Sequence, residues 1–325
     1  MKKKVYFTRR VPETGMKMLQ GKYEVEVFPG PGNADGDTLV SKIQDYDAVV
    51  TLLSDKIDEE LLRKAVNLKI IANYAVGYNN IDIHAARHHK ILVTNTPGVL
   101  TNATGEIAFA LMIALTRRIV EADRFTRNGE FIGWDPLLFL GDELQGKTVG
   151  ILGMGRIGQD MAYKCKAFGM RVIYHSRKPV SGEIEQKLNA AYCSFDQLLS
   201  QSDVISVHTP LNDKTYHLLG RESFCKMKNG VYLVNTSRGE VIDEEVLVEH
   251  LKSGKVKGAG LDVYEYEPVI TRELFSLPNV VLLPHIGSAT IETRNKMSEM
   301  VARNVIAGLE GERPENLVSE LSDLF

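Results

Sequence analysis

The amino-acid sequence predicts an α/β protein with two doubly wound parallel-sheet domains. Short runs rich in β-branched residues alternate with helical segments through the first hundred residues, and the same alternation resumes after residue 147. A glycine-rich turn joins the first strand of the second series to its helix. The chain has 325 residues, which is too many for one small core and suits two domains.

The first series predicts a parallel sheet with helices on both faces. The expected strands are residues 5–8, 23–28, 48–53, 69–73 and 91–94, and the expected helices are 13–19, 37–43, 58–66 and 83–88. Asp58 and Asp82 are expected to cap the last two helices, because their side chains can accept the first free amides. A Pro-Gly-Pro-Gly turn at 29–32 ends the second strand.

Three loops of the first series follow strand carboxyl ends, where parallel sheets bind ligands: residues 53–55, 74–78 and 95–98. The loop at 53–55 is a candidate for substrate selectivity. Val76 and Gly77 could present bare amides to a carboxylate. A plain turn before a helix explains Val76 and Gly77 equally well, and both readings stay open here.

The middle of the chain predicts a helix and an apolar loop. Residues 101–128 form one long helical pattern with an apolar body and a charged far end. Residues 134–140 are apolar without a helical or strand period. Such a loop either meets a partner subunit or packs over the protein's own core, and the sequence does not choose between the two.

The second series opens with a strand at 149–152, the turn Gly153-Met154-Gly155-Arg156-Ile157-Gly158, a helix at 159–168 and a strand at 171–174. Glycine tolerates the tight turn and leaves room for a pyrophosphate, and the new helix offers free amides to the phosphates. A G-x-G-x-x-G inside a βαβ unit therefore predicts a dinucleotide site at Gly153, Gly155, Arg156, Ile157 and Gly158.

The rest of the second series continues the sheet. The expected strands are 203–208, 231–235, 257–263 and 280–283, and the expected helices are 221–226, 243–252 and a closing helix at 290–309. Chemically active groups follow these strands: Thr209-Pro210, Thr236-Ser237-Arg238, Asp262 with Glu267 soon after it, and His285. All of them are expected at the sheet edge where the cofactor would lie.

Arg238, Glu267 and His285 form a complete set for reducing a 2-oxo acid beside a nicotinamide. Hydride transfer to a ketone leaves an alkoxide that needs a proton, and a histidinium can donate it near neutral pH. A carboxylate beside the histidine favours its charged form. An arginine can hold the substrate carboxylate in a fork. Alone, each of these residues is more often a surface ion pair or a satisfied loop residue.

The end of the second strand of this unit suggests which nicotinamide is used. NAD enzymes usually carry Asp or Glu there, bound to the ribose hydroxyls. This chain has His175-Ser176-Arg177-Lys178 instead. A carboxylate would repel a 2′-phosphate, whereas Ser176, Arg177 and Lys178 can bind one. The sequence therefore favours NADP(H), with NAD(H) as the alternative.

Composition excludes several other classes. The net charge of −3 gives no nucleic-acid surface, and no apolar run approaches a membrane span. Cys165, Cys193 and Cys225 lie far apart without metal-like spacing, so we expect reduced thiols, no metal site and a cytoplasmic protein.

Four stretches resemble the D-isomer-specific 2-hydroxyacid dehydrogenase family, and within it the glyoxylate and hydroxypyruvate reductases. They are residues 150–158, 233–239, 260–265 followed by Glu267-Pro268, and 283–289. Similarity covers nearly the whole chain, including residues 73–77 and 96–101.

The resemblance implies roles for single residues. His285 would be the acid/base, Glu267 its partner and Arg238 the substrate anchor, while the Val76 and Gly77 amides would bind the substrate carboxylate and Asp262 the nicotinamide carboxamide. The cofactor would be lined by Thr104, Gly153, Gly155, Arg156, Ile157, Gly158, Ser176, Arg177, Lys178, Thr209, Pro210, Thr236, Ser237, Asp262 and Gly287.

The resemblance also implies an organisation. A discontinuous, flavodoxin-like substrate domain would comprise residues 1–99 and 288–325, with a Rossmann cofactor domain of residues 100–287 inserted into it. Members of this family are usually homodimers joined through the cofactor domain, which suits the apolar loop at 134–140.

Alternatives within and outside the family remain. A 2-ketogluconate reductase stays open. Phosphoglycerate dehydrogenases often carry an added regulatory domain, whereas this chain stops soon after its last expected helix. Formate dehydrogenases pair the histidine with Gln, which Glu267 argues against. A non-catalytic dinucleotide sensor, like the C-terminal-binding-protein corepressors, would not need the full set of Arg238, Glu267 and His285.

Overall fold

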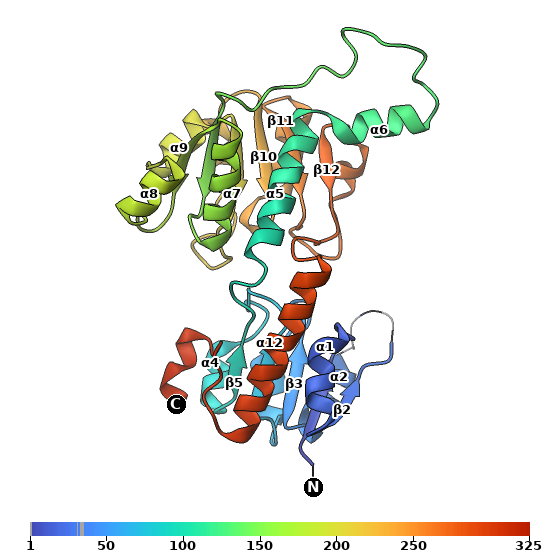
Figure 1. The fold of residues 1–325 in the computed structure, drawn as a ribbon, viewed down its shortest axis with the longest axis vertical. Coiled ribbons are helices and arrows are strands. Elements are labelled where there is room, and N and C mark those ends of the chain that lie inside the picture. Colours follow the sequence, from blue (N-terminus) through green and yellow to red (C-terminus); the bar gives the residue numbers. More distant parts are fainter. Residues whose placement is uncertain (1, 31, 33–35) are drawn as a thin grey trace. The chain divides into compact units, whose positions relative to one another are not determined.

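The computed structural model describes residues 2–30, 32 and 36–325. The chain divides into two compact units, Met1–Leu100 with Ser288–Phe325, and Thr101–Gly287 (Figure 1). Each unit contains one wholly parallel sheet, which confirms the predicted fold class. The turn expected at 29–32 includes Pro31, which lies outside the described residues.

The first unit has a five-stranded sheet in the order β2-β1-β3-β4-β5. This is the flavodoxin-like order, in which the chain turns back between β1 and β3. The strands are β1 (Lys4–Phe7), β2 (Glu24–Val27), β3 (Ala48–Thr51), β4 (Ile70–Asn73) and β5 (Leu92–Thr94). The helices are α1 (Glu13–Gln20), α2 (Gly36–Asp45), α3 (Glu59–Lys64), α4 (Ile83–His88) and α12 (Ile291–Glu310), with a 3₁₀ turn, η3, at Ser319–Leu324.

Helix α12 returns from the far end of the sequence to complete this unit and packs next to α1 (Figure 1). Gly15 makes this approach possible, because a Cβ there would lie 2.0 Å from the Ser298 carbonyl oxygen. Asp58 and Asp82 cap α3 and α4 as predicted, through the amides of Leu61 and Ala85. The C-terminal segment is therefore an integral part of the first sheet domain.

The second unit has a seven-stranded sheet in the order β12-β11-β10-β9-β6-β7-β8. The strands are β6 (Thr148–Leu152), β7 (Arg171–His175), β8 (Ala190–Tyr192), β9 (Val204–Val207), β10 (Val231–Asn235), β11 (Val256–Leu261) and β12 (Val280–Leu282). Strand order reverses between β6 and β9, which is the topological switch point at which a Rossmann sheet binds its ligand.

Helices cover both faces of this second sheet. One buried cluster contains side chains of α5 (Thr101–Thr116), α7 (Arg156–Ala167) and α8 (Gly182–Leu188). The other contains side chains of α9 (Phe195–Gln201), α10 (Arg221–Lys226) and α11 (Glu244–Lys252). Helix α6 (Ile119–Arg127) follows α5, and two 3₁₀ turns, η1 (Gly239–Val241) and η2 (Arg272–Ser276), complete the unit.

The expectation of one helix over residues 101–128 is wrong. Helix α5 ends at Thr116 and α6 begins at Ile119, because Arg118 adopts a left-handed φ of 54°. The Arg118 guanidinium binds the Glu121 carboxylate, which holds the break in place. Residues 116–119 contain neither glycine nor proline, so no helix-breaking residue marks the position of this break.

The apolar loop at 134–140 does not pack over the chain's own core. Trp134, Leu137 and Leu140 are 84%, 74% and 63% exposed. The sequence left two explanations open, and these exposures rule out the one in which the loop packs over the protein's own core. No helix in the described part of the chain is long and apolar enough to cross a membrane.

Candidate active site

The glycine turn after β6 has the geometry of a dinucleotide cradle. Gly153 has a φ of 99°, and a Cβ on Gly158 would lie 2.1 Å from the Gly153 carbonyl oxygen. A Cβ on Gly155 would instead meet nothing within 4 Å. The three glycines thus have separate tasks: a tight turn, an open approach and close packing of α7 on the strand.

Buried polar atoms that follow two other strands of this sheet lack partners within the described chain. The hydroxyl of Thr236, after β10, and Nδ1 of His208, after β9, make no hydrogen bond there. Burial holds His208 neutral by lowering its pKa to about 4. Unpaired buried polar atoms are costly, and a polar ligand beyond these strand ends would satisfy them. The residues present therefore fit a nicotinamide dinucleotide.

The end of β7 carries the residues predicted to meet a ribose phosphate. Arg177 and Lys178 are exposed, and neither forms an ion pair with any residue that the structure describes. Ser176 donates its hydroxyl to the Lys178 carbonyl at 2.7 Å, which folds the three residues into one short turn. Two unpaired cations thus lie where a ribose would be expected.

The neighbouring strands β10, β11 and β12 bring the predicted catalytic residues to one edge. Arg238 follows β10, Glu267 lies in the loop after β11, and His285 follows β12. Nδ1 of His285 donates to Oε2 of Glu267 at 2.9 Å. The two side chains are 27% and 28% exposed, so a small molecule can reach the ring.

Electrostatics at this edge favour an ionised Glu267. Burial alone would raise the pKa of Glu267, but the His285 ring, the Tyr264 amide and the Arg238 charge outweigh it and hold that pKa below its usual value. Burial lowers the pKa of the half-buried Arg238, while the carboxylates of Glu240 and Glu267 oppose this shift. The edge therefore combines a cation, a carboxylate and an imidazole.

The Asp262 carboxylate accepts hydrogen bonds from backbone amides rather than from another side chain. Its two carboxylate oxygens accept the amides of Ile286 and Gly287, each at 2.7 Å. Burial raises the pKa of Asp262, and the two amides and His285 oppose that shift. A Cβ on Gly287 would lie 3.3 Å from a methyl carbon of Thr104, so Thr104 and Gly287 adjoin as well.

Asn235 organises the Arg238 turn, and sequence reasoning missed it. Its side-chain amide donates to the Arg238 carbonyl at 2.8 Å, and its oxygen accepts the Ser237 amide at 3.0 Å. Gly239 then packs against the Tyr264–Glu265 peptide, since a Cβ there would lie 1.8 Å from the Tyr264 carbonyl carbon. The available signal was an asparagine three residues before a loop arginine that is itself followed by glycine.

Comparison with known proteins identifies the family. Residues 109–287 match the model described as "D-isomer specific 2-hydroxyacid dehydrogenase, NAD binding domain". The chain is 53% identical, over 98% of both chains, to a glyoxylate reductase of Thermococcus litoralis. It belongs to the D-isomer-specific 2-hydroxyacid dehydrogenase family. The predicted family resemblance is confirmed, and the protein is an NAD(P)-dependent dehydrogenase.

Solved structures agree with this assignment. A glyoxylate reductase from Paecilomyes thermophila superposes with a TM-score of 0.89 at 36% identity, covering 98% of this chain and 99% of that one. An NADPH-dependent glyoxylate/hydroxypyruvate reductase from Sinorhizobium meliloti, in complex with NADP and malonate, gives 0.88 at 31% identity, covering 99% and 98%.

The first unit of this dehydrogenase contains the other predicted substrate loop. Asn95 and Asn73 donate to the carbonyls of Val76 and Gly77 at 2.7 and 2.8 Å. No hydrogen bond joins either amide to a described acceptor. The loop at 53–55 is anchored by Asp55, a buried residue that accepts the Leu52 amide at 2.7 Å and the Thr8 hydroxyl.

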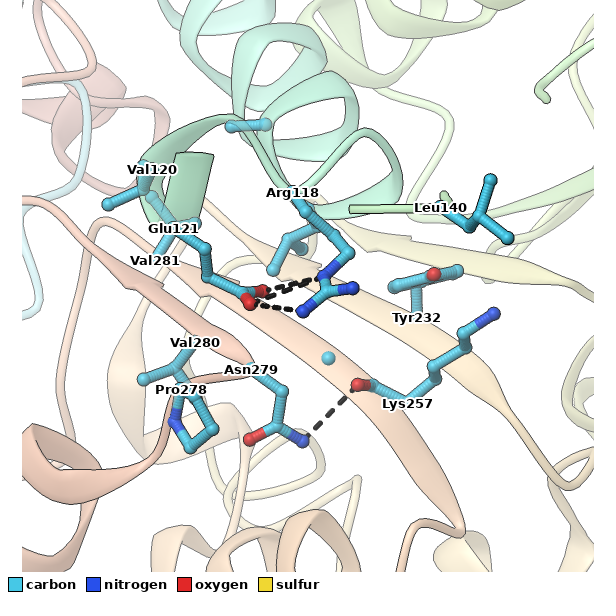
Figure 2. Close-up of a pocket in the computed structure, with 13 residues that line it drawn as sticks. Arg118, Val120, Glu121, Leu140, Tyr232, Lys257, Pro278, Asn279, Val280 and Val281 are labelled. Atoms are coloured by element: carbon cyan, nitrogen blue, oxygen red, sulfur yellow. Dashed lines mark hydrogen bonds and ion pairs between the residues drawn. The ribbon is translucent and has the colours of Figure 1, made fainter. Parts of the chain in front are cut away.

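A pocket elsewhere on the dehydrogenase lies away from the predicted catalytic residues. Figure 2 shows it at the starts of β10 and β11, beside Tyr232 and Lys257, so it lies at the opposite sheet edge from Arg238. Its charged groups are already paired, Arg118 with Glu121 and Lys257 with Asp142. Among the described residues, no group of His, Cys, Asp and Glu is arranged to hold a metal.

Proposed function

We propose that this dehydrogenase reduces a small 2-oxo acid, glyoxylate or hydroxypyruvate, to the D-2-hydroxy acid, with NADPH as the preferred reductant. The observation that carries the proposal is the 2.9 Å contact between His285 and Glu267 at the edge that Arg238 shares. The similarity to glyoxylate reductases over the whole chain supports this substrate class.

His285 is the proton donor in this proposal. The nicotinamide, when bound, supplies the hydride to the carbonyl carbon. The Nδ1 proton of His285 is engaged by Glu267, which leaves Nε2 to face the substrate. As negative charge develops on the carbonyl oxygen, the imidazolium gives it the Nε2 proton and becomes neutral, and Glu267 keeps the ring oriented.

Arg238 is the proposed substrate anchor. A guanidinium can bind a carboxylate with two parallel hydrogen bonds, and its charge also polarises the adjacent carbonyl. Asn235 supports this role, because it holds the backbone from which the Arg238 side chain extends. In the first unit, the Val76 and Gly77 amides are proposed as donors to a substrate carboxylate, supported by the two asparagines that fix their carbonyls.

The proposed lining of the cofactor follows the glycine turn and the strand ends around it. Gly153, Gly155 and Gly158, with Arg156 and Ile157, would hold the pyrophosphate at the start of α7. Thr209, Pro210, Thr236 and Ser237, with Thr104 and Gly287, would line the rest, and Asp262 would meet the carboxamide. Preference for NADPH is supported by Ser176 and by the two unpaired cations Arg177 and Lys178.

A homodimer joined through the cofactor domain is part of the proposal. Phe131, Ile132 and Trp134 are 57%, 99% and 84% exposed, and Leu137 follows them at 74%. Soluble monomers rarely expose so continuous an apolar segment. A second copy of the chain would cover it.

A kinetic panel tests the proposed function. Glyoxylate, hydroxypyruvate, 2-ketogluconate and phosphohydroxypyruvate are each offered with NADPH and with NADH, and nicotinamide absorbance is followed. We expect the highest kcat/KM for glyoxylate or hydroxypyruvate with NADPH. Absence of turnover with every oxo acid would overturn the enzymatic proposal in favour of a dinucleotide sensor, and a clear preference for 2-ketogluconate would overturn the substrate class.

A further inference from the structure

A second histidine–carboxylate cluster lies near the catalytic edge of the Thr101–Gly287 unit. Nε2 of His217 donates to Oε1 of Glu265 at 2.7 Å. Glu265 is buried, whereas the His217 side chain is 30% exposed. A buried carboxylate is costly unless its oxygens are hydrogen-bonded, so the partners of Glu265 indicate what it holds in place.

Glu265 and Glu244 fix each other's backbone. The Glu244 amide donates to Oε2 of Glu265 at 3.1 Å, and the Glu265 amide donates to Oε1 of Glu244 at 2.8 Å. The Thr271 hydroxyl donates to the second oxygen of Glu244 at 2.6 Å. Glu244, 2% exposed, begins α11, so the reciprocal pair ties the start of that helix to the loop after β11.

That loop carries Glu267, the partner of His285. The Tyr264 amide donates to Oε1 of Glu267 at 3.0 Å, which leaves Oε2 for the His285 ring. Gly239 closes the other side, because its missing Cβ lets the backbone after Arg238 lie directly on the Tyr264–Glu265 peptide. The peptide before Glu265 is thus held from two directions.

We propose that Glu265, secured by Glu244 and His217, is a positioning residue of the reaction: it fixes the backbone of residues 264–267 and so the direction from which Glu267 meets His285. The inference rests on the proposed function, because that reaction supplies the rate that changes. Glu265 touches no reacting atom in this account and acts only through Glu267.

Other charged and aromatic groups face this cluster. Oδ2 of Asp243 lies 3.9 Å from Nδ1 of His217, and the Tyr216 ring stacks on the imidazole with centroids 4.1 Å apart. The Glu265 carboxylate, through a hydrogen bond, raises the pKa of Tyr266 to about 12, with Glu245 adding to the shift. Acidic groups therefore lie beside both ring nitrogens of His217.

Replacement of Glu265 by Gln in the full-length protein is the test. The variant keeps the shape of the side chain but removes the negative charge of the carboxylate that accepts hydrogen bonds from His217 and from the Glu244 amide. We expect kcat for oxo-acid reduction to fall by on the order of tenfold, since small misplacements of acid–base groups are costly. The alkaline limb of the pH–rate profile should move to lower pH, while NADPH affinity stays unchanged.

A readout independent of turnover follows the hydrogen bond itself. In protein labelled with ¹⁵N-histidine, the Nδ1 proton of His285 should resonate far downfield while Glu267 accepts it, and the variant His285→Asn assigns the signal. Glu265→Gln should shift this proton upfield, as Glu267→Gln does. If wild-type protein reduces no oxo acid, the proposed function falls, and this signal still decides the role of Glu265.

Matched variants separate positioning from general stability. Asp203→Asn removes another carboxylate charge that holds a backbone amide, that of Thr148 at 2.8 Å, but at the amino edge of the sheet. It should lower Tm and leave kcat, the pH profile and the Nδ1 proton unchanged. Should Glu265→Gln not fold, His217→Gln replaces it as the test, because a change at this partly exposed side chain disturbs the core less. The inference is overturned if Glu265→Gln, or His217→Gln in its place, lowers Tm but keeps the wild-type pH–rate profile and the wild-type position of the His285 Nδ1 proton signal.

Discussion

Asp262 and His285 are joined through the backbone, not through their side chains. The Asp262 carboxylate accepts the two amides that directly follow His285, those of Ile286 and Gly287. His285 has a φ of 54°, a left-handed conformation that is unfavourable for a residue with a Cβ. Two hydrogen bonds to a buried carboxylate can stabilise such a conformation. Asp262 thus sets the backbone of His285, and Glu267 sets its ring.

Replacing His285 by Ala should remove the proton donor and leave cofactor binding intact. General acid catalysis contributes about 10²- to 10⁴-fold, so kcat for reduction should fall by that order. Fluorescence titration with NADPH should give a nearly unchanged Kd, because the glycine turn is untouched. A kcat close to that of wild type would remove His285 from the mechanism.

The dependence on pH should reveal Glu267. Because the folded pKa of Glu267 lies below its usual value, its contact with His285 is present above that usual value and is lost as pH falls through the lowered pKa. Loss of activity due to Glu267 should therefore begin only below pH 4.5, the ordinary value for Glu. Glu267→Gln should abolish this acidic limb and move the alkaline limb to lower pH.

The measurement is kcat/KM for reduction across the acidic and neutral range, with circular dichroism at each pH to exclude unfolding. Wild-type protein that loses activity at or above the ordinary Glu pKa, while still folded, would contradict the assignment of Glu267 as the ionised partner.

Arg238→Lys should be severe although the charge is kept. An ammonium cannot make the planar fork, so two parallel hydrogen bonds to the substrate carboxylate are lost. We expect kcat/KM to fall by on the order of 10²-fold or more, since charge-assisted pairs are the stronger hydrogen bonds. Arg221→Lys is the matched control, because Arg221 pairs with Glu249 on the exposed surface at 2.7 Å. A small rise in KM alone would assign Arg238 a lesser part.

Local patterns in the sequence were sufficient to predict the two parallel sheets, apart from β8, and to place three candidate site residues at neighbouring strand ends. Parallel strands put their carboxyl ends on one edge, so Arg238, Asp262 and His285 could be grouped without knowledge of their distances. Elements with weak periodicity were missed, namely α8, β8 and α9. The signal for α9 was present, since Ser194 and Gln197 form a reciprocal capping box.

Features that depend on tertiary contacts could not be predicted. The left-handed Arg118 that divides α5 from α6 is fixed by its own ion pair, and no glycine or proline marks its position in the sequence. The reciprocal pair of Glu244 and Glu265 joins segments 21 residues apart, and no local pattern in either segment indicates this contact. The roles of the site residues themselves stay predictions that the variants described here can test.

The glycine turn offers a comparison of two residues of the same type. Gly155→Ala should fold normally, because its Cβ enters open space, yet it should weaken NADPH binding by filling the approach to the pyrophosphate. Gly158→Ala should instead destabilise the fold, since its Cβ would lie 2.1 Å from the Gly153 carbonyl oxygen. Thermal melts with and without NADPH measure both effects. Equal NADPH affinity of Gly155→Ala and wild type would place the cofactor elsewhere.

Preference for NADPH should depend on Arg177 and Lys178. Both are exposed and form no ion pair with a described residue, so their charges are available to a 2′-phosphate. Replacing both by Gln should lower kcat/KM with NADPH by about tenfold or more and leave that with NADH little changed, because each charge-assisted hydrogen bond contributes about 1.5–3 kcal/mol. Arg313→Gln, in the first unit, is a control that removes one exposed positive charge. If wild-type protein turns over NADH with the higher kcat/KM, or if the double variant loses both activities equally, these two cations do not select the cofactor.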